Sequence, residues 1–250
     1  MLPQHRITTI ISTSPIPSLP ATDHIELTVE SLAMVAELEQ SPLIIAFDGA
    51  DDSVDKNVYD MYKHAVMRKF AMRKNVRFVM LEAWGHLSGV LRAALGCVAT
   101  QYVFVQQHDL PIVRAFDLDA VLCALGARGD VKHVRLNSRC TEAIGWDKSP
   151  LFGPVEGKKI GLTRTSCWSD QSHFSTLEYY TEVILPRIAN KAVFPETVLN
   201  PFRKLPVEEL LSIHRVLGTY IYGFPGEQRI VAHTDARRTL SPSIAREETR

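Results

Sequence analysis

The 250-residue sequence has no excess of charge of either sign, because 28 Lys and Arg residues balance 28 Asp and Glu residues. Nucleic-acid binding through bulk positive charge is therefore not expected. The sequence also lacks any apolar run near the ~20 residues that a membrane-spanning helix requires. The short, polar segment Met1–Arg6 shows no secretory signal. These absences predict a soluble globular protein with no membrane span.

Cysteine is scarce, and its spacing excludes the common metal-binding motifs. Cys97, Cys123, Cys140 and Cys167 form no Cys-x-x-Cys pair and no zinc spacing. Cys97 and Cys123 lie in apolar, helix-like surroundings, which predicts that they are buried as small hydrophobic residues. Free thiols are typical of a reducing compartment, so the sequence favours a cytoplasmic location.

Strand-like and helix-like segments alternate in the first part of the chain, from Ile7 to Asn137. The expected strands are 7–12, 42–47, 76–81, 102–105 and 131–136, and the expected helices are 25–39, 55–73, 88–98 and 116–127. Strands that alternate with helices form βαβ units and a mainly parallel sheet. The pattern therefore predicts an α/β protein with a mainly parallel central sheet.

The character of the sequence changes after Asn137. The expected elements are a loop with short strands over 138–165, helices over 172–185 and 207–214, and short strands at 220–223 and 230–233. Pro186 is expected to end or kink the first of these helices. The mixed-charge tail 237–250 is expected to be flexible. This half is thus predicted to be an extension of helices and short strands on the same domain.

Polar side chains follow the apolar strand Tyr102–Val105 directly, in the order Gln106, Gln107, His108 and Asp109. Open α/β sheets bind their ligands at the carboxyl ends of parallel strands. A carboxylate at such a position can hold Mg²⁺ or Mn²⁺, which keep phosphate oxygens and waters as their other ligands. Asp109 can equally cap the strand end and turn the chain, and this segment alone leaves both interpretations open.

The helix before this strand contains Leu87-Ser88 and Arg92, and the strand leads into Gln107-His108-Asp109. Segment 86–111 thereby resembles the GT-A glycosyltransferases, especially the inverting family 2. In that family a Gly-Leu-Ser-x-x-Arg-Asn helix precedes a Gly-x-Tyr-hydrophobic strand and an Asp-x-Asp motif. Arg92 comes one residue later than in the family pattern, and Gln107 replaces the first acid. Taken alone, Arg92 suits either a phosphate contact or a solvated helix surface.

Two earlier landmarks follow the family order. Ile10–Pro15 resembles the first strand with its base-binding loop, and Asp48-Gly49 resembles the acid and glycine after the second strand. In isolation, Asp48-Gly49 is also typical of a plain turn. The resemblance implies a single GT-A-like, Rossmann-related domain. The donor-binding residues that it implies are Thr13, Ser14, Pro15, Asp48, Arg92, Gln107 and His108.

The resemblance also implies a metal site. Asp109 matches the carboxylate that bridges the metal and the donor, and metal-dependent members often add a histidine near the end of the domain. His233 is the best-placed histidine here, with a surface position as the alternative interpretation. Mn²⁺ or Mg²⁺ is the implied cofactor.

A second site-like segment, Thr163–His173, leads into the helix expected over 172–185. Asp170 would then lie at a helix start, where it can act as an N-cap and interact with the helix dipole. Inverting GT-A enzymes have an acid at a helix start, often after an aromatic residue, that serves as base toward the acceptor hydroxyl. Trp168-Ser169-Asp170 resembles that arrangement. Asp170 is therefore the implied catalytic base, with Trp168 and His173 as acceptor contacts, and a pure capping role is the alternative.

The function implied is a metal-assisted, inverting transfer of a hexose-type sugar from a nucleotide-diphosphate donor to a glycan or other hydroxyl acceptor. Residues 1–137 would bind the nucleotide sugar and residues 138–236 the acceptor. Trp84 and Trp146 offer either sugar-stacking surfaces or core packing.

Three other functions stay open from the sequence. Gln107, in place of an acid, keeps a non-catalytic nucleotide- or sugar-binding module among them. A nucleotidyltransferase would usually have a Gly-rich, basic phosphate loop, but residues 12–20 contain no Gly, Lys or Arg. A non-haem iron or zinc enzyme would need a further histidine, and none follows His233.

Overall fold

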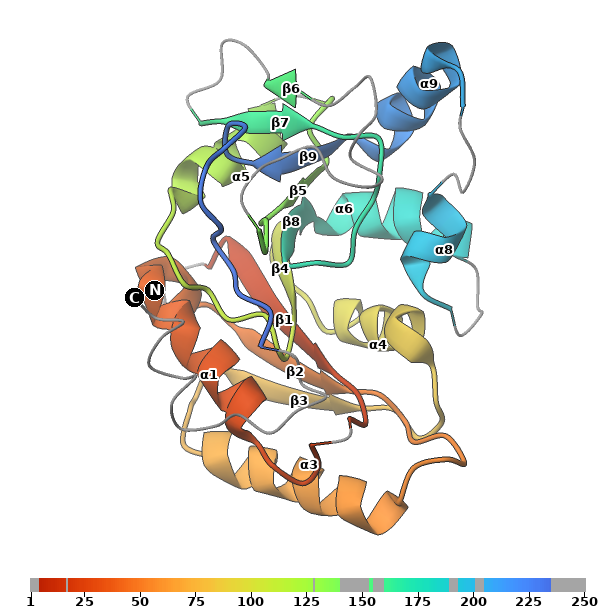
Figure 1. Cartoon of the computed structure of the whole chain (residues 1–250). Coiled ribbons are helices and arrows are strands. Elements are labelled where there is room, and N and C mark those ends of the chain that lie inside the picture. Colours follow the sequence, from red (N-terminus) through yellow and green to blue (C-terminus); the bar gives the residue numbers. More distant parts are fainter. Residues whose placement is uncertain are drawn as a thin grey trace.

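A computed structural model of the chain describes residues 5–16, 18–127, 129–139, 153–154, 160–188, 193–200 and 205–234. Within these residues the strands form one sheet of nine, in the order β3-β2-β1-β4-β8-β5-β9-β7-β6 (Figure 1). Helices cover both faces of this sheet, and each face has its own hydrophobic core. The predicted single α/β domain is therefore confirmed.

The N-terminal half of the sheet is parallel. Its strands are β3 (Val76–Met80), β2 (Leu43–Phe47), β1 (Ile7–Thr13) and β4 (Tyr102–Gln107). The central strand β1 pairs on both sides, so that Ile10 lies opposite Ile44 and Val105. Because the carboxyl ends of parallel strands meet at one edge, the polar residues after β1, β2 and β4 are brought together there.

Alternate side chains of these strands enter the two cores. Ile45 and Phe47 pack with α1 (Asp23–Ser31), α3 (Lys56–Phe70) and α5 (Leu118–Ala127), whereas Ile44 and Ala46 pack with α4 (His86–Leu95). Burial on both faces explains why 42–47 is a continuous apolar run. The sequence predicts one helix over 25–39. In the structure, the 3₁₀ turn η1 (Leu32–Met34) separates α1 from the short helix α2 (Ala36–Gln40).

The other half of the sheet is mixed. Strand β8 (His173–Thr176) runs antiparallel to both β4 and β5 (His133–Arg135), and β9 (Thr219–Tyr222) runs parallel to β5. The outer strands are β7 (Leu162–Arg164), antiparallel to β9, and β6 (Gly153–Pro154). The parallel character that the sequence predicts is thus concentrated in the first four strands.

The helix expected over 172–185 is wrong at its start. His173–Thr176 form β8, and the helix begins at α6 (Leu177–Tyr179), where the Thr176 hydroxyl oxygen accepts the Tyr179 N–H at 3.0 Å. Strands on both sides give β8 backbone partners, and this tertiary pairing outweighs the local helical pattern. The helix continues past Pro186, through the π-helical turn η3 (Tyr180–Ile184) into α7 (Leu185–Ile188).

Two further helices complete the face that α4 covers. They are α8 (Pro195–Leu199) and α9 (Val207–Leu217), and both contribute a buried leucine to that core. Residues 230–233 form no full strand, because only an isolated bridge joins Val231 to Ile112. The tail 237–250 and Trp146 lie outside the described residues.

Two expectations from the composition can be compared with the structure. Cys123 is exposed and Cys97 is half-buried, so the predicted burial is wrong for Cys123, whereas Cys167 is buried. Cys140 lies outside the described residues. In the part of the chain that the structure describes, no helix has the length and apolar character needed to cross a bilayer.

Candidate functional site

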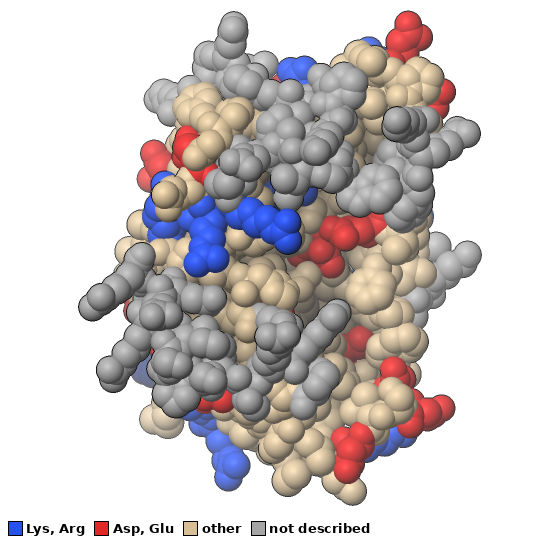
Figure 2. Space-filling model, viewed as in Figure 1, with Lys and Arg blue, Asp and Glu red and all other residues tan. Residues whose placement is uncertain are grey.

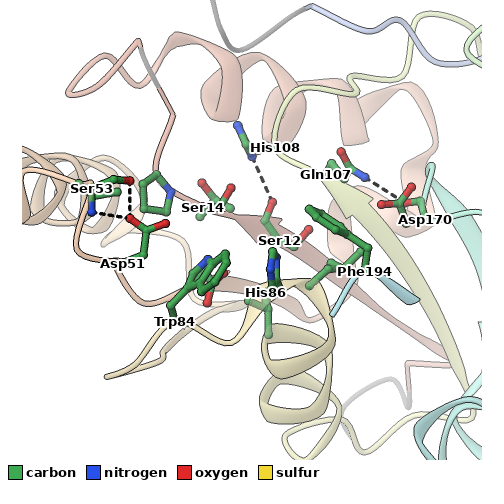
Figure 3. A pocket seen from close by; sticks show the side chains of 16 residues that line it. Ser12, Ser14, Asp51, Ser53, Trp84, His86, Gln107, His108, Asp170 and Phe194 are labelled. Atoms are coloured by element: carbon green, nitrogen blue, oxygen red, sulfur yellow. Dashed lines mark hydrogen bonds between the residues drawn. The ribbon is translucent and has the colours of Figure 1, made fainter. Parts of the chain in front are cut away.

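A first cavity, called cavity A here, opens at the carboxyl edge of the parallel strands and has a volume of about 380 Å³ (Figure 3). Its lining includes residues from the ends of β1, β2 and β4 and from the start of α4. Of the predicted site residues, those that line it are Thr13, Ser14, Pro15, Asp48, Gln107, His108 and Asp170. The structure therefore brings these seven side chains to one place.

Asp48 organises the floor of cavity A. It is 3% exposed, and its Oδ1 accepts the N–H groups of Gly49 and Gly85 at 2.8 Å each. Burial raises the pKa of this carboxyl, and the two N–H donors oppose that rise by stabilising the charged form. A side chain at Gly49 would place its Cβ 2.2 Å from the Ala83 backbone, so only glycine fits beside Asp48. Asp48 thus fixes the turn from which α4 begins.

That turn holds His86 with a φ of 52°, a left-handed conformation in which non-glycine residues are uncommon. The His86 ring lies between Trp84 and Phe194, at centroid distances of 3.8 and 4.6 Å. Trp84 is 43% exposed and Phe194 is 51% exposed, and all three residues line cavity A. Figure 3 shows the three rings in a row along the cavity. Of the two roles open for Trp84, core packing is therefore excluded.

A second cavity, cavity B, adjoins the first and has a volume of about 870 Å³. Its polar lining includes Gln107, Arg135, Asn137, Ser138, Arg139, Asp170, Glu196, Arg229 and His233. Gln107 and Asp170 line both cavities, so the two spaces meet at this pair. The Gln107 Nε2 group donates to the Asp170 carbonyl oxygen at 3.4 Å, which links the end of β4 to the segment before β8.

Asp170 has an acidic neighbour that its local sequence does not reveal. Its backbone N–H donates to Glu196 Oε1 at 2.9 Å, and Glu196 lies in the first turn of α8. Burial, the Glu196 charge and a side-chain hydrogen bond with Glu196 together raise the pKa of Asp170 to about 8. The predicted N-cap role is wrong, because a strand follows Asp170 and Thr176 caps the helix.

The two predicted metal ligands also lie together. Asp109 Oδ2 is 3.4 Å from His233 Nε2, and the Asp109 carbonyl oxygen accepts both the N–H and the hydroxyl of Thr234, at 3.0 and 3.2 Å. These bonds fix the chain segment of His233 beside the end of β4. Among the described residues, no group of three or more His, Cys, Asp or Glu is placed to hold a metal. This pair alone would therefore offer two protein ligands.

His108 lines cavity A and directly precedes Asp109 in the chain. Its Nδ1–H donates to the Ser12 carbonyl oxygen at 3.3 Å, and the residue is only 7% exposed. Burial lowers the pKa of His108, so the imidazole is neutral near pH 7. In this state His108 can donate one hydrogen bond and accept another, but it brings no positive charge to the cavity.

Two predicted residues, Arg92 and His173, line neither cavity, and a third, Trp168, lines cavity B as a buried side chain. Arg92 is in the last turn of α4 and donates from Nη2 to the Leu185 carbonyl oxygen at 3.4 Å. His173 is fully buried in β8, where it donates to the Gln171 carbonyl oxygen and accepts from the Tyr180 hydroxyl. Trp168 lines cavity B but is 1% exposed.

Glu196, His86 and the arginines of cavity B line the two cavities but are not among the site residues predicted from the sequence. Pro195 before Glu196 is a typical helix start, yet nothing local connects Glu196 with Asp170, which is 26 residues away. The ring stack of His86 depends equally on Phe194 from a distant segment. These contacts are formed only by the tertiary fold.

No family model and no curated protein sequence matches this chain. Among solved structures, residues 1–349 of S. aureus TarS are 12% identical and match 92% of this chain and 60% of that chain, with a TM-score of 0.51. The same fragment in complex with UDP-GlcNAc is 12% identical and matches 97% of this chain and 64% of that chain, with a TM-score of 0.50.

A longer TarS structure is 14% identical and matches 97% of this chain but only 38% of that chain, with a TM-score of 0.51. The present chain thus spans less than two thirds of each TarS chain that it matches. At such identities the likeness concerns the fold alone. That fold is the one of GT-A-type glycosyltransferases, as the resemblance in the sequence predicts.

Proposed function

We propose that this chain is a glycosyltransferase that moves a sugar from a nucleoside diphosphate to an acceptor hydroxyl with inversion at the anomeric carbon. The observation that carries the proposal is the position of Asp170, an acid of raised pKa at the junction of two cavities. A group that must accept a proton between two substrates requires such a position, with one substrate on each side.

Cavity A is the proposed donor site. It lies at the carboxyl edge of the parallel strands, where open α/β sheets bind nucleotides. Thr13, Ser14 and Pro15 border it at the end of β1, and the exposed rings of Trp84 and Phe194 offer flat apolar surfaces for a base or sugar. Since TarS has been solved with UDP-GlcNAc, a uridine diphosphate sugar is the first donor to test.

Asp109 and His233 are the proposed protein ligands of Mn²⁺ or Mg²⁺. Their 3.4 Å separation is shorter than twice a metal–ligand distance of ~2.1 Å, so both atoms can contact one cation. Two protein ligands suit Mg²⁺-like ions, which keep waters and substrate phosphates as further ligands. A bound cation would neutralise charge on the leaving diphosphate. Because Gln107 replaces an acid, metal retention should depend on the donor.

Asp170 is the proposed general base. Its carboxylate accepts the proton of the acceptor hydroxyl as that oxygen attacks the anomeric carbon, and such assistance contributes ~10²–10⁴-fold to the rate. Glu196 acts on Asp170 as a positioning residue: it holds the Asp170 backbone through the 2.9 Å hydrogen bond and keeps the carboxyl basic by its charge. A base with a pKa near the working pH balances availability and strength.

A panel of UDP-, GDP-, dTDP- and CDP-sugars, each with and without Mn²⁺, tests the proposal by thermal shift. One donor should stabilise the fold, by about 2.7 kcal/mol at a hundredfold excess over its dissociation constant. Release of free sugar or transfer should follow with that donor. Failure of every nucleotide sugar to bind would overturn the proposal.

A non-catalytic nucleotide-sugar-binding module is the second candidate, and Gln107 in place of a metal-binding acid favours it. Such a module would give the same thermal shift with one donor but no hydrolysis and no transfer. Turnover measured with the donor that stabilises the chain therefore separates the two functions.

A further inference from the structure

Cavity B contains an unusual concentration of arginine. Arg135, Arg139 and Arg229 line it, and none of them lines cavity A. Arg135 belongs to β5 and is only 7% exposed, whereas Arg139 and Arg229 are exposed. Among the described residues that line it, the acids are Asp170 and Glu196. In Figure 2, Lys and Arg side chains lie directly beside acidic side chains across the middle of the face that is shown.

The backbone keeps these arginines together although they are distant in sequence. The Asn137 carbonyl oxygen accepts the N–H groups of Ile230 and Val231, at 3.1 and 3.4 Å. These two hydrogen bonds place Arg229, the residue before Ile230, next to the segment that contains Arg135 and Arg139. Backbone hydrogen bonds therefore hold together the two segments that carry these three arginines.

Three guanidinium groups on a cavity wall define the chemistry that the cavity can recognise. The guanidinium fork matches phosphate and carboxylate groups and binds them through paired hydrogen bonds. A neutral sugar hydroxyl needs no such charge. The negative charge of the Asp170–Glu196 pair repels an anion, so an anionic molecule in cavity B would direct its charged group toward the arginines and a hydroxyl toward the acids.

We propose that the acceptor carries a phosphate or carboxylate group, and that Arg139 and Arg229, with Arg135 behind them, bind this group in cavity B. This inference rests on the proposed function, because it takes Asp170 as the base that faces the acceptor hydroxyl. The arginines then determine which hydroxyl reaches Asp170, since they fix the far end of the acceptor. The arginines therefore select an acceptor that carries a negative charge.

Titration calorimetry tests this with three probes that differ in one group: glucose 6-phosphate, glucuronate and glucose. The two anions should bind, and glucose should bind far more weakly. The double variant Arg139→Gln/Arg229→Gln should lose at least about tenfold in affinity for the preferred anion, since it removes charge-assisted hydrogen bonds. The matched control is Arg68→Gln on the exposed side of α3, which should change nothing. Arg135 stays intact because its burial makes its removal a risk to folding.

Two outcomes of this titration would overturn the inference. One is glucose binding as tightly as the anions. The other is an unchanged affinity for the preferred anion in a folded Arg139→Gln/Arg229→Gln protein. A preference between glucose 6-phosphate and glucuronate identifies whether phosphate or carboxylate is the group bound, and either preference supports the inference.

A second arm uses UDP to distinguish acceptor binding from binding of the donor diphosphate. The double variant should keep the UDP affinity of the wild type, and saturating UDP should not displace the bound anion. A parallel loss of UDP affinity would show that the arginines hold the donor and would overturn the inference. If UDP fails to bind the wild-type protein, the donor site proposed above is wrong, whereas the sugar titrations still decide the anion site.

Discussion

The two halves of the sheet assemble their side chains in different ways. In the parallel half, each polar group lies at the end of its own strand: Thr13 ends β1, Asp48 follows β2 and Gln107 ends β4. In the mixed half, Asp170 meets Glu196 from a segment 26 residues away. Parallel strands bring their carboxyl ends together by topology alone, whereas the mixed half depends on individual tertiary contacts.

The comparison also separates two kinds of chemistry. Cavity A has the Asp48 carboxyl group at its floor and the row of rings formed by Trp84, His86 and Phe194, which offers flat surfaces for a base or a sugar. Cavity B combines an acid pair with arginines, which suits a polar, charged molecule. If the halves act as donor and acceptor sites, substitutions should affect one binding event and spare the other.

The largest effect is expected where the halves meet. Asp109→Ala should abolish turnover and remove the Mn²⁺-dependent part of donor stabilisation, because it deletes the carboxylate of the Asp109–His233 pair. Turnover and donor thermal shift with and without Mn²⁺ measure this. Asp60→Ala, an exposed acid on α3, is the matched control. Wild-type activity in Asp109→Ala would show that the metal assignment is wrong.

Asp170→Asn should remove most of the transfer activity without changing the binding of the donor. The amide cannot accept the proton, so transfer should fall by ~10²–10⁴-fold. Donor affinity should stay unchanged, because the donor contacts of cavity A remain. Transfer rates and donor titration calorimetry on the same preparation check both parts. A normal transfer rate in the folded variant would direct the search for the base to Glu196.

Glu196→Gln should shift the pH dependence of kcat/KM to lower pH. Removal of the neighbouring negative charge lowers the pKa of Asp170, which Glu196 and burial hold at about 8. Since the base works only when deprotonated, wild-type kcat/KM should rise with pH up to this pKa, and the variant's rise should occur at lower pH. Profiles between pH 5 and 9 measure the shift. Glu208→Gln, exposed on α9, should leave the profile unchanged, and a profile for Glu196→Gln equal to wild type would exclude the proposed role.

Arg92→Ala is expected to have the smallest effect. Its contact with the Leu185 carbonyl oxygen joins α4 to α7, so its loss should lower the free energy of unfolding by about 1 kcal/mol. Donor affinity should not change, because Arg92 lines neither cavity. Chemical denaturation and donor titration measure the two quantities. Weakened donor binding in a folded variant would restore the role that the family resemblance implies.

The parallel half could be predicted closely because its signals are local. A continuous apolar run such as 42–47 is typical of a strand buried on both faces, and the helices between such strands indicate a parallel sheet. The edge at which polar residues gather follows from that pattern. Five of the seven residues predicted to bind the donor end or directly follow β1 and β4, and they line cavity A.

The mixed half shows where the sequence alone is insufficient. His173–Thr176 has a pattern that fits a helix, but it lies between β4 and β5 and pairs with both. Because of this pairing, Asp170 precedes a strand instead of starting a helix. The surroundings of its carboxyl group therefore differ from those that the sequence predicts. Propensity is a weak constraint where backbone partners are available on both sides.

The sequence by itself determined the α/β class, the parallel strands and the residues at their carboxyl ends, because side-chain periodicity and burial act over a few neighbouring residues. Only the tertiary structure decided that Glu196 raises the pKa of Asp170, that Arg92 turns to Leu185 and that Arg229 joins Arg135. Those interactions fall off with distance in space and are independent of distance along the chain, so they exist only once the fold has formed.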